Sequence, residues 1–363
     1  MSLITRAAEA VSRVLNSAKG DGDDMTESGA TEIWDSRYAA ESTAVARTDS
    51  AGDAVDYMTH PFLWRQAVAR RLTGSTDGDP SLDFCLKHLQ PPAQKMLAIG
   101  SGLATLEQWV VECGFAEHCI AYEASQSAVD KASQRIREAG LEGRLEMRCG
   151  DVRESGIPDG TFDLVMVQAA IHHFFEIEDM FALMHRVLKP GGILMFDEYI
   201  GPDHLQFSDA DLAIMDEIFA CLDERYRVDN RTGQPRDGIL KPTLQQMLDM
   251  DPSEGVHATR ILPLTYRYFE VVDRRDYGGT ILRPFFSGIL QNFNFDDPRD
   301  QTIGRMIVLL EDVLLREGRI GHAHTRLVAR RRDVPLPPLE GADAERINYA
   351  DWAGMRPATG QAG

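Results

Sequence analysis

The feature that most constrains this chain is the stretch from Lys95 to Glu107, in which an apolar run ends in a glycine pair and a second partly apolar segment follows. Residues 95–99 read as a buried strand, and the later segment reads as a helix. Gly100 and Gly102 allow the backbone to approach a ligand closely, and the first turn of a helix presents unpaired N–H groups. The stretch therefore predicts a strand, a ligand-binding turn and a helix.

Further apolar runs follow at the spacing of alternating strands and helices. They are His118–Tyr122 before Glu123, Arg144–Cys149 before Gly150 and Asp151, Phe162–Val167 before Gln168, and Ile193–Phe196 after the segment Leu188–Gly192. This alternation predicts a parallel sheet with right-handed crossovers over residues 92–199.

On these motifs the chain resembles the class I, Rossmann-like S-adenosylmethionine-dependent methyltransferases. The resemblance implies an α/β fold with a doubly wound, mostly parallel seven-stranded sheet and an antiparallel final strand, plus a helical N-terminal cap and helical insertions. It implies S-adenosylmethionine as the cofactor and S-adenosylhomocysteine as the product. It also places cofactor-binding groups at Gly100, Ser101, Gly102, Glu123, Ala124, Asp151, Val152 and Gln168.

Two positions depart from the glycine-loop pattern of the family. Ala104 stands where the pattern has its third glycine, so we expect a slightly displaced loop. Ala98 stands where many relatives carry an acid that steadies the loop. These alanines leave open a binding protein with a regulatory or scaffold role and no activity. A nicotinamide-dependent oxidoreductase is disfavoured, because its G-x-G-x-x-G pattern needs a glycine where Thr105 stands.

Two acids follow predicted strands. Glu123 comes about twenty residues after the glycine pair, a spacing that favours a carboxylate bound to both ribose hydroxyls over a solvated acid at a strand end. For Asp151 the resemblance implies contact with the adenine amino group, with Val152 offering its backbone N–H. The Gly150-Asp151 pair is also ordinary turn chemistry.

Adjacent histidines, His172 and His173, follow the fourth predicted strand. Methyl transfer from a sulfonium requires in-line alignment of the nucleophile and, for a hydroxyl, removal of a proton. An imidazole suits that task because its pKa lies near neutrality. We expect His172, ahead of His173, to be the catalytic base, the alternative being a packing or capping role for at least one of them.

The fifth predicted strand ends in Asp197, Glu198 and Tyr199. Alternation sends Asp197 and Tyr199 to one side of the sheet and Glu198 to the other, and either set could bind a substrate. We expect substrate contacts from Asp197 and Tyr199, together with Tyr38 and Trp64 from an aromatic-rich helical region.

Composition and charge limit the kinds of molecule that this chain is expected to bind. A net charge of −19 argues against a nucleic-acid substrate. No apolar run is long enough to cross a bilayer, although an amphipathic helix over Leu3–Leu15 could dock on the protein itself, on a partner or on a membrane.

Five cysteines without a C-x-x-C pair suit a reducing cytoplasm. We expect a cytoplasmic protein with a small-molecule substrate, for which a homodimer stays open. No metal site is expected, because His322 and His324 lack a nearby partner in the sequence.

Composition shifts divide the chain. The expected parts are an N-terminal helix and linker over 1–30, a helical cap over 31–91, the cofactor-binding core over 92–200, a helical insertion over 201–264, closing strands with inserted helices over 265–332, and a mobile tail over 333–363. The closing antiparallel pair is expected at Thr265–Val272 and His322–Arg330.

Three later motifs, Glu198–Pro202, Asp251–Glu254 and Tyr277–Thr280, resemble those of bacterial methyltransferases of uncertain substrate among polysaccharide and secondary-metabolite enzymes. We therefore expect methyl transfer to a small polar molecule, at a hydroxyl oxygen, with N-methylation as the alternative.

Overall fold

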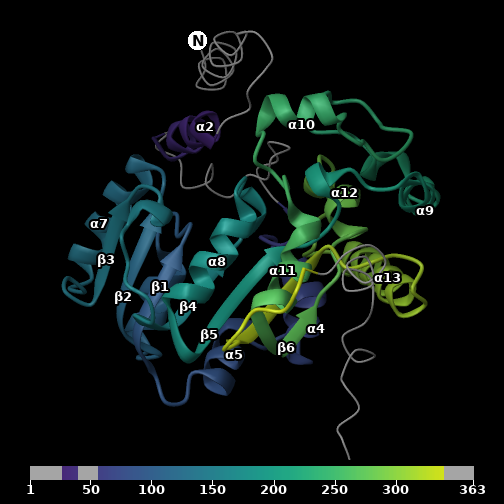
Figure 1. The fold of residues 1–363 in the computed structure, drawn as a ribbon. Helices are drawn as coiled ribbons and strands as arrows, with labels where there is room; N and C mark the ends of the chain where they lie inside the picture. The colour runs from purple at the N-terminus through teal and green to yellow at the C-terminus, as the bar shows by residue number, and fades with distance from the viewer. Residues whose placement is uncertain (1–26, 40–55, 339–363) are drawn as a thin grey trace, which may run out of the picture.

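The computed structural model describes residues 27–39 and 56–338, and Figure 1 shows how they are arranged. The helix expected at Leu3–Leu15 and the tail beyond residue 338 lie outside the described residues. Helix α2 (Glu27–Ala39) begins before residue 30, so the expected boundary between linker and cap falls inside a helix.

Seven strands form one sheet in the order β3-β2-β1-β4-β5-β7-β6. Their bounds are β1 (Ala93–Ile99), β2 (Ala116–Glu123), β3 (Leu145–Cys149), β4 (Phe162–Gln168), β5 (Leu188–Tyr199), β6 (Phe269–Asp276) and β7 (His324–Arg331). The first five strands pair in parallel, whereas β7 runs antiparallel to both β5 and β6. The expected doubly wound sheet with an antiparallel final strand is confirmed.

The central strand β1 is buried on both faces, which is why its sequence reads as a continuous apolar run. Leu97 packs into one apolar cluster, while its neighbours Met96 and Ala98 pack into another on the opposite face. Around the sheet lie α5 (Pro80–His88), α6 (Thr105–Glu112), α7 (Gln126–Glu138), α8 (Ile177–Val187) and α11 (Ile261–Tyr268). The parallel register therefore brings the ends of β1, β2 and β4 together at one edge of the sheet.

Further helices lie beside the sheet. They are α3 (Pro61–Trp64), α4 (Arg70–Thr73), α9 (Asp209–Ala220), α12 (Leu282–Phe286) and α13 (Pro298–Arg316), while α10 (Leu244–Met250) lies at the top of the view in Figure 1. A third apolar cluster joins Leu63, Phe219, Phe285 and Ile307, which come from four of these helices. Segments before the sheet and insertions after β5 and β6 thus share one core.

The expected strand Thr265–Val272 is wrong in its first half. Residues up to Tyr268 belong to α11, and β6 begins at Phe269. Ile261, Leu262 and Leu264 of α11 are buried in the cluster that contains Phe181 of α8. This packing of a helical apolar face outweighs the strand preference of the β-branched and aromatic residues at the end of the helix.

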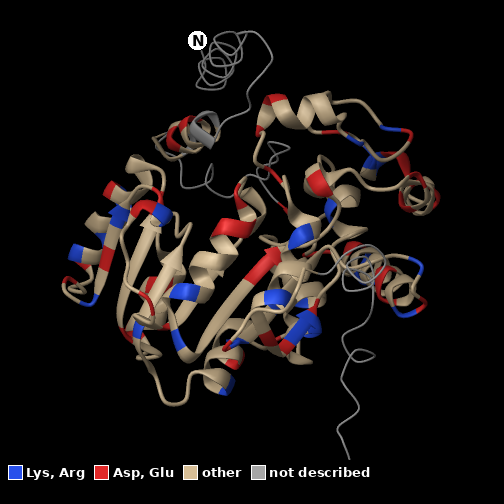
Figure 2. Cartoon of the chain, viewed as in Figure 1, with Lys and Arg blue, Asp and Glu red and all other residues tan. Residues whose placement is uncertain are grey.

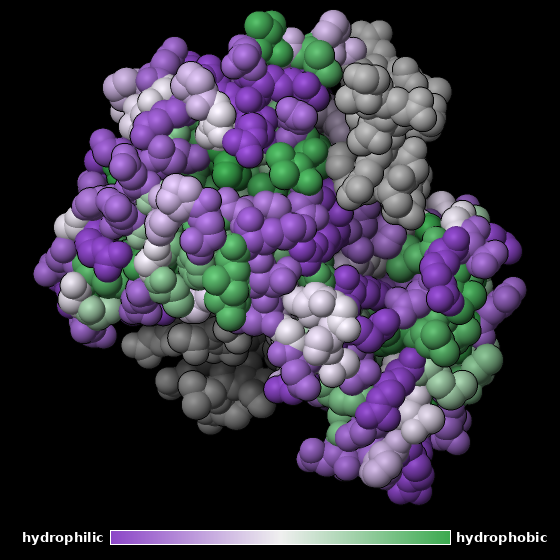
Figure 3. Space-filling model, turned by 90° about the horizontal axis from the view of Figure 1, so that it is seen from below, coloured by the Kyte–Doolittle hydropathy of each residue, from purple (hydrophilic) through white to green (hydrophobic). Residues whose placement is uncertain are grey.

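Charged residues of both signs are interspersed over the ribbon in the view of Figure 2. Seen from below, the surface is largely hydrophilic, with hydrophobic residues in separate groups (Figure 3). Within residues 27–39 and 56–338, no helix combines the length and the apolar character needed to cross a membrane.

Candidate active site

The glycine loop leaves β1 and enters α6 as the sequence predicts. Gly100 and Gly102 have φ values of 64° and 52°. Ala104 takes the same left-handed region, with φ 51° and ψ 35°, and is the N-cap of α6. An alanine thus adopts the backbone conformation that the family's third glycine would take more easily, so the turn is kept at some cost in strain.

Glu123, at the end of β2, lies directly under this loop. Its Oε2 accepts a 2.7 Å hydrogen bond from the N–H of Gly102, and its Oε1 accepts a 3.0 Å bond from the N–H of Ser125. Burial raises the pKa of the Glu123 carboxyl above its ordinary value. The acid that was expected to bind the ribose therefore also steadies the loop, a role that Ala98 cannot fill.

The other expected cofactor residues also lie at the ends of strands. Ala124 follows β2, Gln168 ends β4 and is exposed, and Asp151 with Val152 follows β3. The Asp151 carboxylate accepts hydrogen bonds from both the backbone N–H and the guanidinium of Arg153. Burial raises the pKa of Asp151, but these contacts outweigh it and the pKa is lowered.

Helix α2 lies beside the glycine loop and the start of α7. Asp35 Oδ1 accepts hydrogen bonds from the Ser125 hydroxyl at 2.8 Å and from the Ser127 N–H at 2.9 Å. A Cβ placed on Gly102 would lie 2.6 Å from the Tyr38 hydroxyl. Tyr38, which was expected at the substrate, lies against the glycine loop.

The two histidines lie on a short 3-10 turn (Ile171–His173) that follows β4. Nδ1 of His172 lies 2.6 Å from Oε2 of Glu198, and Oε1 of Glu198 accepts 2.6 Å hydrogen bonds from the N–H groups of Ala170 and Ile171. An ionised carboxylate only accepts, so Nδ1 of His172 carries the donated proton. Burial lowers the pKa of His172, but Glu198 outweighs it and the pKa is raised.

The turn also packs against the glycine loop. A Cβ built on Gly100 would lie 2.5 Å from Cβ of Ala170, the residue just before the histidine turn. Trp34 of α2 meets the ring of His173 edge-on, with 4.9 Å between the ring centroids. The loop and the histidine turn are therefore neighbours, and α2 contacts both.

The ring of His173 faces the segment after α10. Its Nδ1 lies 3.0 Å from the Ser253 hydroxyl, which donates a 2.6 Å hydrogen bond to Asp251 Oδ1. Because the serine proton goes to Asp251, the serine oxygen accepts from Nδ1 of His173. Burial and the neighbouring His172 lower the pKa of His173 to about 4.

Glu254 completes the cluster. Its Oε2 lies 3.8 Å from Nε2 of His173, and its Oε1 accepts a 3.2 Å hydrogen bond from Arg283. Burial raises the pKa of Glu254, but Arg283 and the two histidines outweigh it, so that the pKa falls to about 2. A buried anion therefore faces the imidazole of His173.

Among the expected substrate contacts, Asp197 and Trp64 have other partners in the structure, whereas Tyr199 lies beside His172. The Asp197 carboxylate is bound by Tyr277 at 2.6 Å and by Nε of Arg326 at 2.9 Å, so it forms a structural ion pair. Trp64 packs in the third apolar cluster. Tyr199 donates its hydroxyl to the Pro202 carbonyl, while its ring lies edge-on to His172 at 6.1 Å. The acid that reaches the histidines is Glu198, on the other side of the strand from Asp197.

Residues 97–196, which contain the glycine loop, Glu123 and the histidine turn, match the family model described as a methyltransferase domain. This segment is a methyltransferase domain. It belongs to the Rossmann-like, S-adenosylmethionine-dependent class that the sequence motifs resemble. The histidine turn and Glu123 thus lie inside the matched domain, whereas Glu198 and the Asp251–Glu254 segment lie beyond its end.

Similar curated proteins act on different kinds of atoms, as their names state. A sterol 24-C-methyltransferase of Neurospora crassa is 30% identical over 126 residues, covering 33% of this chain and 33% of that protein. Phosphoethanolamine N-methyltransferase 1 of Arabidopsis thaliana is 26% identical, covering 40% and 30%. A ubiquinone/menaquinone biosynthesis C-methyltransferase of Pseudoalteromonas translucida is 25% identical, covering 45% and 58%. The chain spans less than two thirds of the length of each of these relatives.

The sequence does not reveal that Ser253, Glu254 and Arg283 lie around the histidine turn. It leaves Glu198 as one of two alternatives beside Asp197, and it offers Trp34 only as part of an aromatic-rich helical region. The Asp251–Glu254 motif was noticed only as a resemblance. No local pattern in the sequence could place this motif against a turn eighty residues away.

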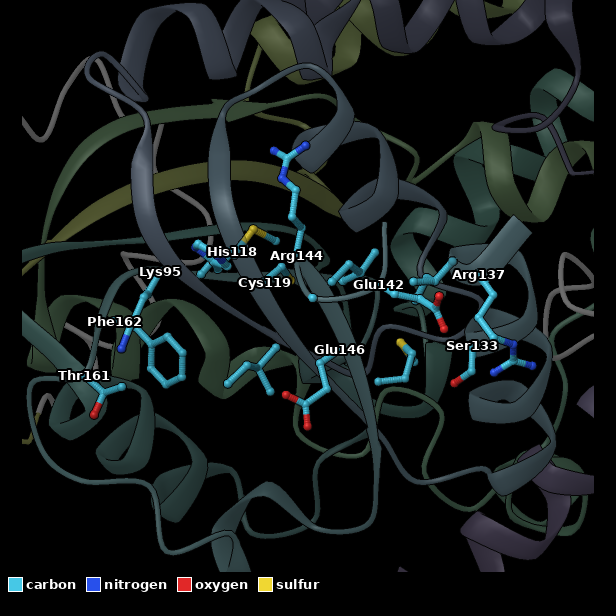
Figure 4. A pocket seen from close by; sticks show the side chains of 16 residues that line it. Lys95, His118, Cys119, Ser133, Arg137, Glu142, Arg144, Glu146, Thr161 and Phe162 are labelled. Carbon is cyan, nitrogen blue, oxygen red and sulfur yellow. The ribbon is translucent and has the colours of Figure 1, made fainter. Parts of the chain in front are cut away.

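A cavity of about 590 Å³ lies elsewhere in the methyltransferase domain (Figure 4). Lys95, His118, Glu146 and Phe162 line it, and these residues lie toward the amino ends of β1 to β4. Ligands of doubly wound sheets bind outside the carboxyl ends of the strands. The cavity therefore lies at the opposite edge of the sheet from the glycine loop and the histidine turn.

Proposed function

We propose that the chain catalyses transfer of a methyl group from S-adenosylmethionine to a hydroxyl oxygen of a small polar molecule. The observation that carries this proposal is the packing of the glycine loop against the histidine turn, where a Cβ on Gly100 would meet Ala170 at 2.5 Å. A cofactor bound at the loop would therefore end close to His172 and His173. In-line methyl transfer needs such proximity between donor and acceptor.

On this proposal the loop residues Gly100, Ser101 and Gly102 hold the methionine part of the cofactor. The Glu123 carboxylate accepts from the ribose hydroxyls, where it now accepts from the Gly102 and Ser125 N–H groups. Its buried position supports this role, because a charge-assisted hydrogen bond is strongest where water is excluded. Ala124, Asp151, Val152 and Gln168 then surround the adenosine end of the cofactor.

Methyl transfer from a sulfonium needs alignment of the acceptor and loss of one proton. An oxygen lone pair forms the new C–O bond while the C–S bond breaks, and the electron pair of that bond stays on sulfur, giving neutral S-adenosylhomocysteine. The acceptor oxygen must lose its proton, and His172 and His173 are the groups at this edge that can promote the loss. Their placement next to the loop supports oxygen as the acceptor.

Helix α2 supports a closed site. Asp35 ties the helix to the start of α7, Tyr38 lies over Gly102, and Trp34 covers His173. Residues of one helix therefore contact both the cofactor side and the acceptor side. A cover of this kind would exclude water from the reacting groups.

A transfer assay tests the proposal. Tritiated S-adenosylmethionine is offered with one pool of polyhydroxylated compounds that lack amines and one pool of amines that lack hydroxyls. We expect label in the hydroxyl pool, reduced by about a hundredfold in His172→Asn while S-adenosylhomocysteine affinity stays constant. Label in the amine pool alone would show N-methylation. No label in either pool, beside normal cofactor binding, would favour a silent binding protein.

A further inference from the structure

Three side chains with lone-pair donor atoms converge beside the glycine loop. His172, His173 and Glu254 each offer one nitrogen or oxygen ligand atom, and these three atoms lie within 4.8 Å of one another. Two of the residues come from the turn after β4 and the third from the segment after α10. The three side chains are only 6% to 15% exposed, so a small ion fits among them more readily than an organic molecule.

Each histidine is oriented in the way that metal ligands usually are. A ligating imidazole almost always donates its other ring N–H to a carboxylate, carbonyl or water, which fixes the tautomer. His172 donates Nδ1–H to Glu198, and His173 donates Nδ1–H to Ser253, which in turn is held by Asp251. In the neutral form, each ring therefore carries its lone pair on Nε2.

The carboxylate is oriented as well. Arg283 binds Oε1 of Glu254, and Oε2 faces Nε2 of His173 at 3.8 Å. Both of these atoms are acceptors, and at this distance they form no hydrogen bond with each other. A cation between them would satisfy both.

The distances lie a little above those that such a cation requires. Bonds of about 2.0–2.1 Å to imidazole and about 2.0–2.2 Å to carboxylate place two ligand atoms of one tetrahedral ion about 3.3–3.5 Å apart. The 3.8 Å separation exceeds this spacing by about 0.4 Å. The other ligand atoms lie within 4.8 Å of one another, so rotation of the side chains has to draw them closer when the ion binds.

We propose that His172, His173 and Glu254 bind one divalent first-row transition-metal ion and leave a coordination position open toward the acceptor. Two imidazoles and a carboxylate suit Zn²⁺ or Fe²⁺ better than Mg²⁺ or Ca²⁺, which prefer all-oxygen sites. With the ion bound, the histidines promote loss of the proton through the ion and not as bases, because an acceptor hydroxyl bound to the ion loses its proton to water more easily, as metal-bound water does. This catalytic use of the ion rests on the proposed function, whereas binding of the ion does not.

The test uses Co²⁺ as an optical probe on the full chain after treatment with EDTA and removal of the chelator. Nitrogen and oxygen ligands give visible d–d bands, whereas thiolate ligands add intense charge-transfer absorption in the near ultraviolet. This difference separates the proposed site from the exposed Cys113, Cys149 and Cys221. We expect d–d bands that saturate at one equivalent of Co²⁺ and vanish on addition of Zn²⁺.

Variants assign the bands to the site. Glu254→Gln and His173→Asn should each weaken Co²⁺ binding by more than about a hundredfold, and Glu198→Gln, which changes only an outer partner, by about ten- to a hundredfold. His257→Asn is the matched control, because it makes the same change three residues after Glu254, outside the cluster, and should bind as the original chain does.

Three results would overturn the proposal: no d–d bands, charge-transfer bands that mark cysteine ligands, or unchanged affinity in both Glu254→Gln and His173→Asn. Circular dichroism identifies a variant that has not folded. If one of these two variants does not fold, the Co²⁺ affinity of the other one tests the proposal. S-adenosylhomocysteine titrated into the metal-free chain separates the two proposals. Binding of the thioether without binding of Co²⁺ removes only the metal site, and absence of thioether binding counts against the proposed function.

Discussion

The backbone N–H of Gly102 donates a 2.7 Å hydrogen bond to Oε2 of Glu123. This contact joins the loop after β1 to the end of β2, two parts of the proposed cofactor site that are 21 residues apart. It explains how the loop keeps its turn although Ala98 and Ala104 replace two features of the family pattern. The acid is fixed by the loop that it supports, so under the proposed function its carboxylate is in place before a ribose arrives.

Gly102→Val should abolish cofactor binding while the chain still folds. The new Cβ would lie 2.6 Å from the Tyr38 hydroxyl, and a β-branched residue at φ 52° is strained by about 1–3 kcal/mol. Calorimetry with S-adenosylhomocysteine and a thermal melt measure the two effects. Gly140→Val is the control, because Gly140 has φ 68° with nothing within 4 Å, so it adds the strain without the contact. Equal affinity in both variants would make the loop purely structural.

Asp35→Ala should release α2 and weaken S-adenosylhomocysteine binding by about tenfold, the scale of one to two hydrogen bonds. The side chain now holds Ser125 and Ser127 at the start of α7. Asp35→Asn keeps an acceptor oxygen and should retain most of the affinity. If Asp35→Ala binds as tightly as the original chain, α2 does not take part in the cofactor site.

Glu107 gives the chain a pH-dependent stability. It is 5% exposed, and burial, with a contribution from Glu123, raises its pKa to about 7. Between pH 4.5 and 7 the folded chain therefore holds a proton that the unfolded chain releases, so this group's contribution to stability falls as pH rises through that window and levels off above it.

Glu107→Gln should remove this fall, which amounts to roughly 3 kcal/mol for a shift of this size. Urea unfolding of the original chain and of Glu107→Gln at pH 5 and pH 8 measures this fall in stability. The pH-dependent change in the unfolding free energy is then compared between the two chains, because the other titrating groups contribute equally to both. Parallel stability changes in the two chains would show that Glu107 titrates normally.

A buried ion pair holds the turn Tyr277–Thr280 in place. The Glu311 carboxylate, fully buried on α13, accepts hydrogen bonds from the N–H groups of Gly279, Ile281 and Leu282 and pairs with Arg71 at 2.6 Å. Glu311→Gln removes the charge and leaves the buried Arg71 guanidinium with Asp312 as its remaining carboxylate partner.

Glu311→Gln should therefore destabilise the chain by about 3–5 kcal/mol, as expected when one partner of a buried pair is removed. Chemical unfolding measures the loss, and Glu317→Gln, an exposed change just beyond the end of the same helix, should have almost no effect. A loss below about 1 kcal/mol, the scale of an exposed pair, would show that the turn does not depend on Glu311.

Much of the methyltransferase domain could be predicted because its signals are local. The strand, the glycine pair and the helix adjoin in sequence, and the spacing to Glu123 reflects one crossover. Alternation also placed Asp197 and Glu198 on opposite sides of β5, but it could not tell which side faced the histidine turn. The side of Asp197 faces Arg326 on β7 and Tyr277 just after β6, and both of these residues bind its carboxylate. Neither contact can be read from the sequence around β5.

The partners of His173 could not be predicted, for a different reason. Ser253 and Glu254 are eighty or more residues away, in an insertion whose path is set by packing against the sheet and the helical body. No periodicity links them to the turn after β4. Similarly, the end of α11 carried strand-forming residues, and only its burial against α8 decided for a helix.

The most direct test of the central claim is a calorimetric titration of S-adenosylhomocysteine into the original chain, Glu123→Gln and Glu123→Ala. The account predicts one binding site in the original chain and, in Glu123→Ala, affinity weaker by about 1.5–3 kcal/mol, the value of a charge-assisted hydrogen bond. Glu123→Gln, which can still accept from one hydroxyl, should lie between them. No binding to the original chain, or equal affinity in a folded Glu123→Ala, would contradict the placement of the cofactor.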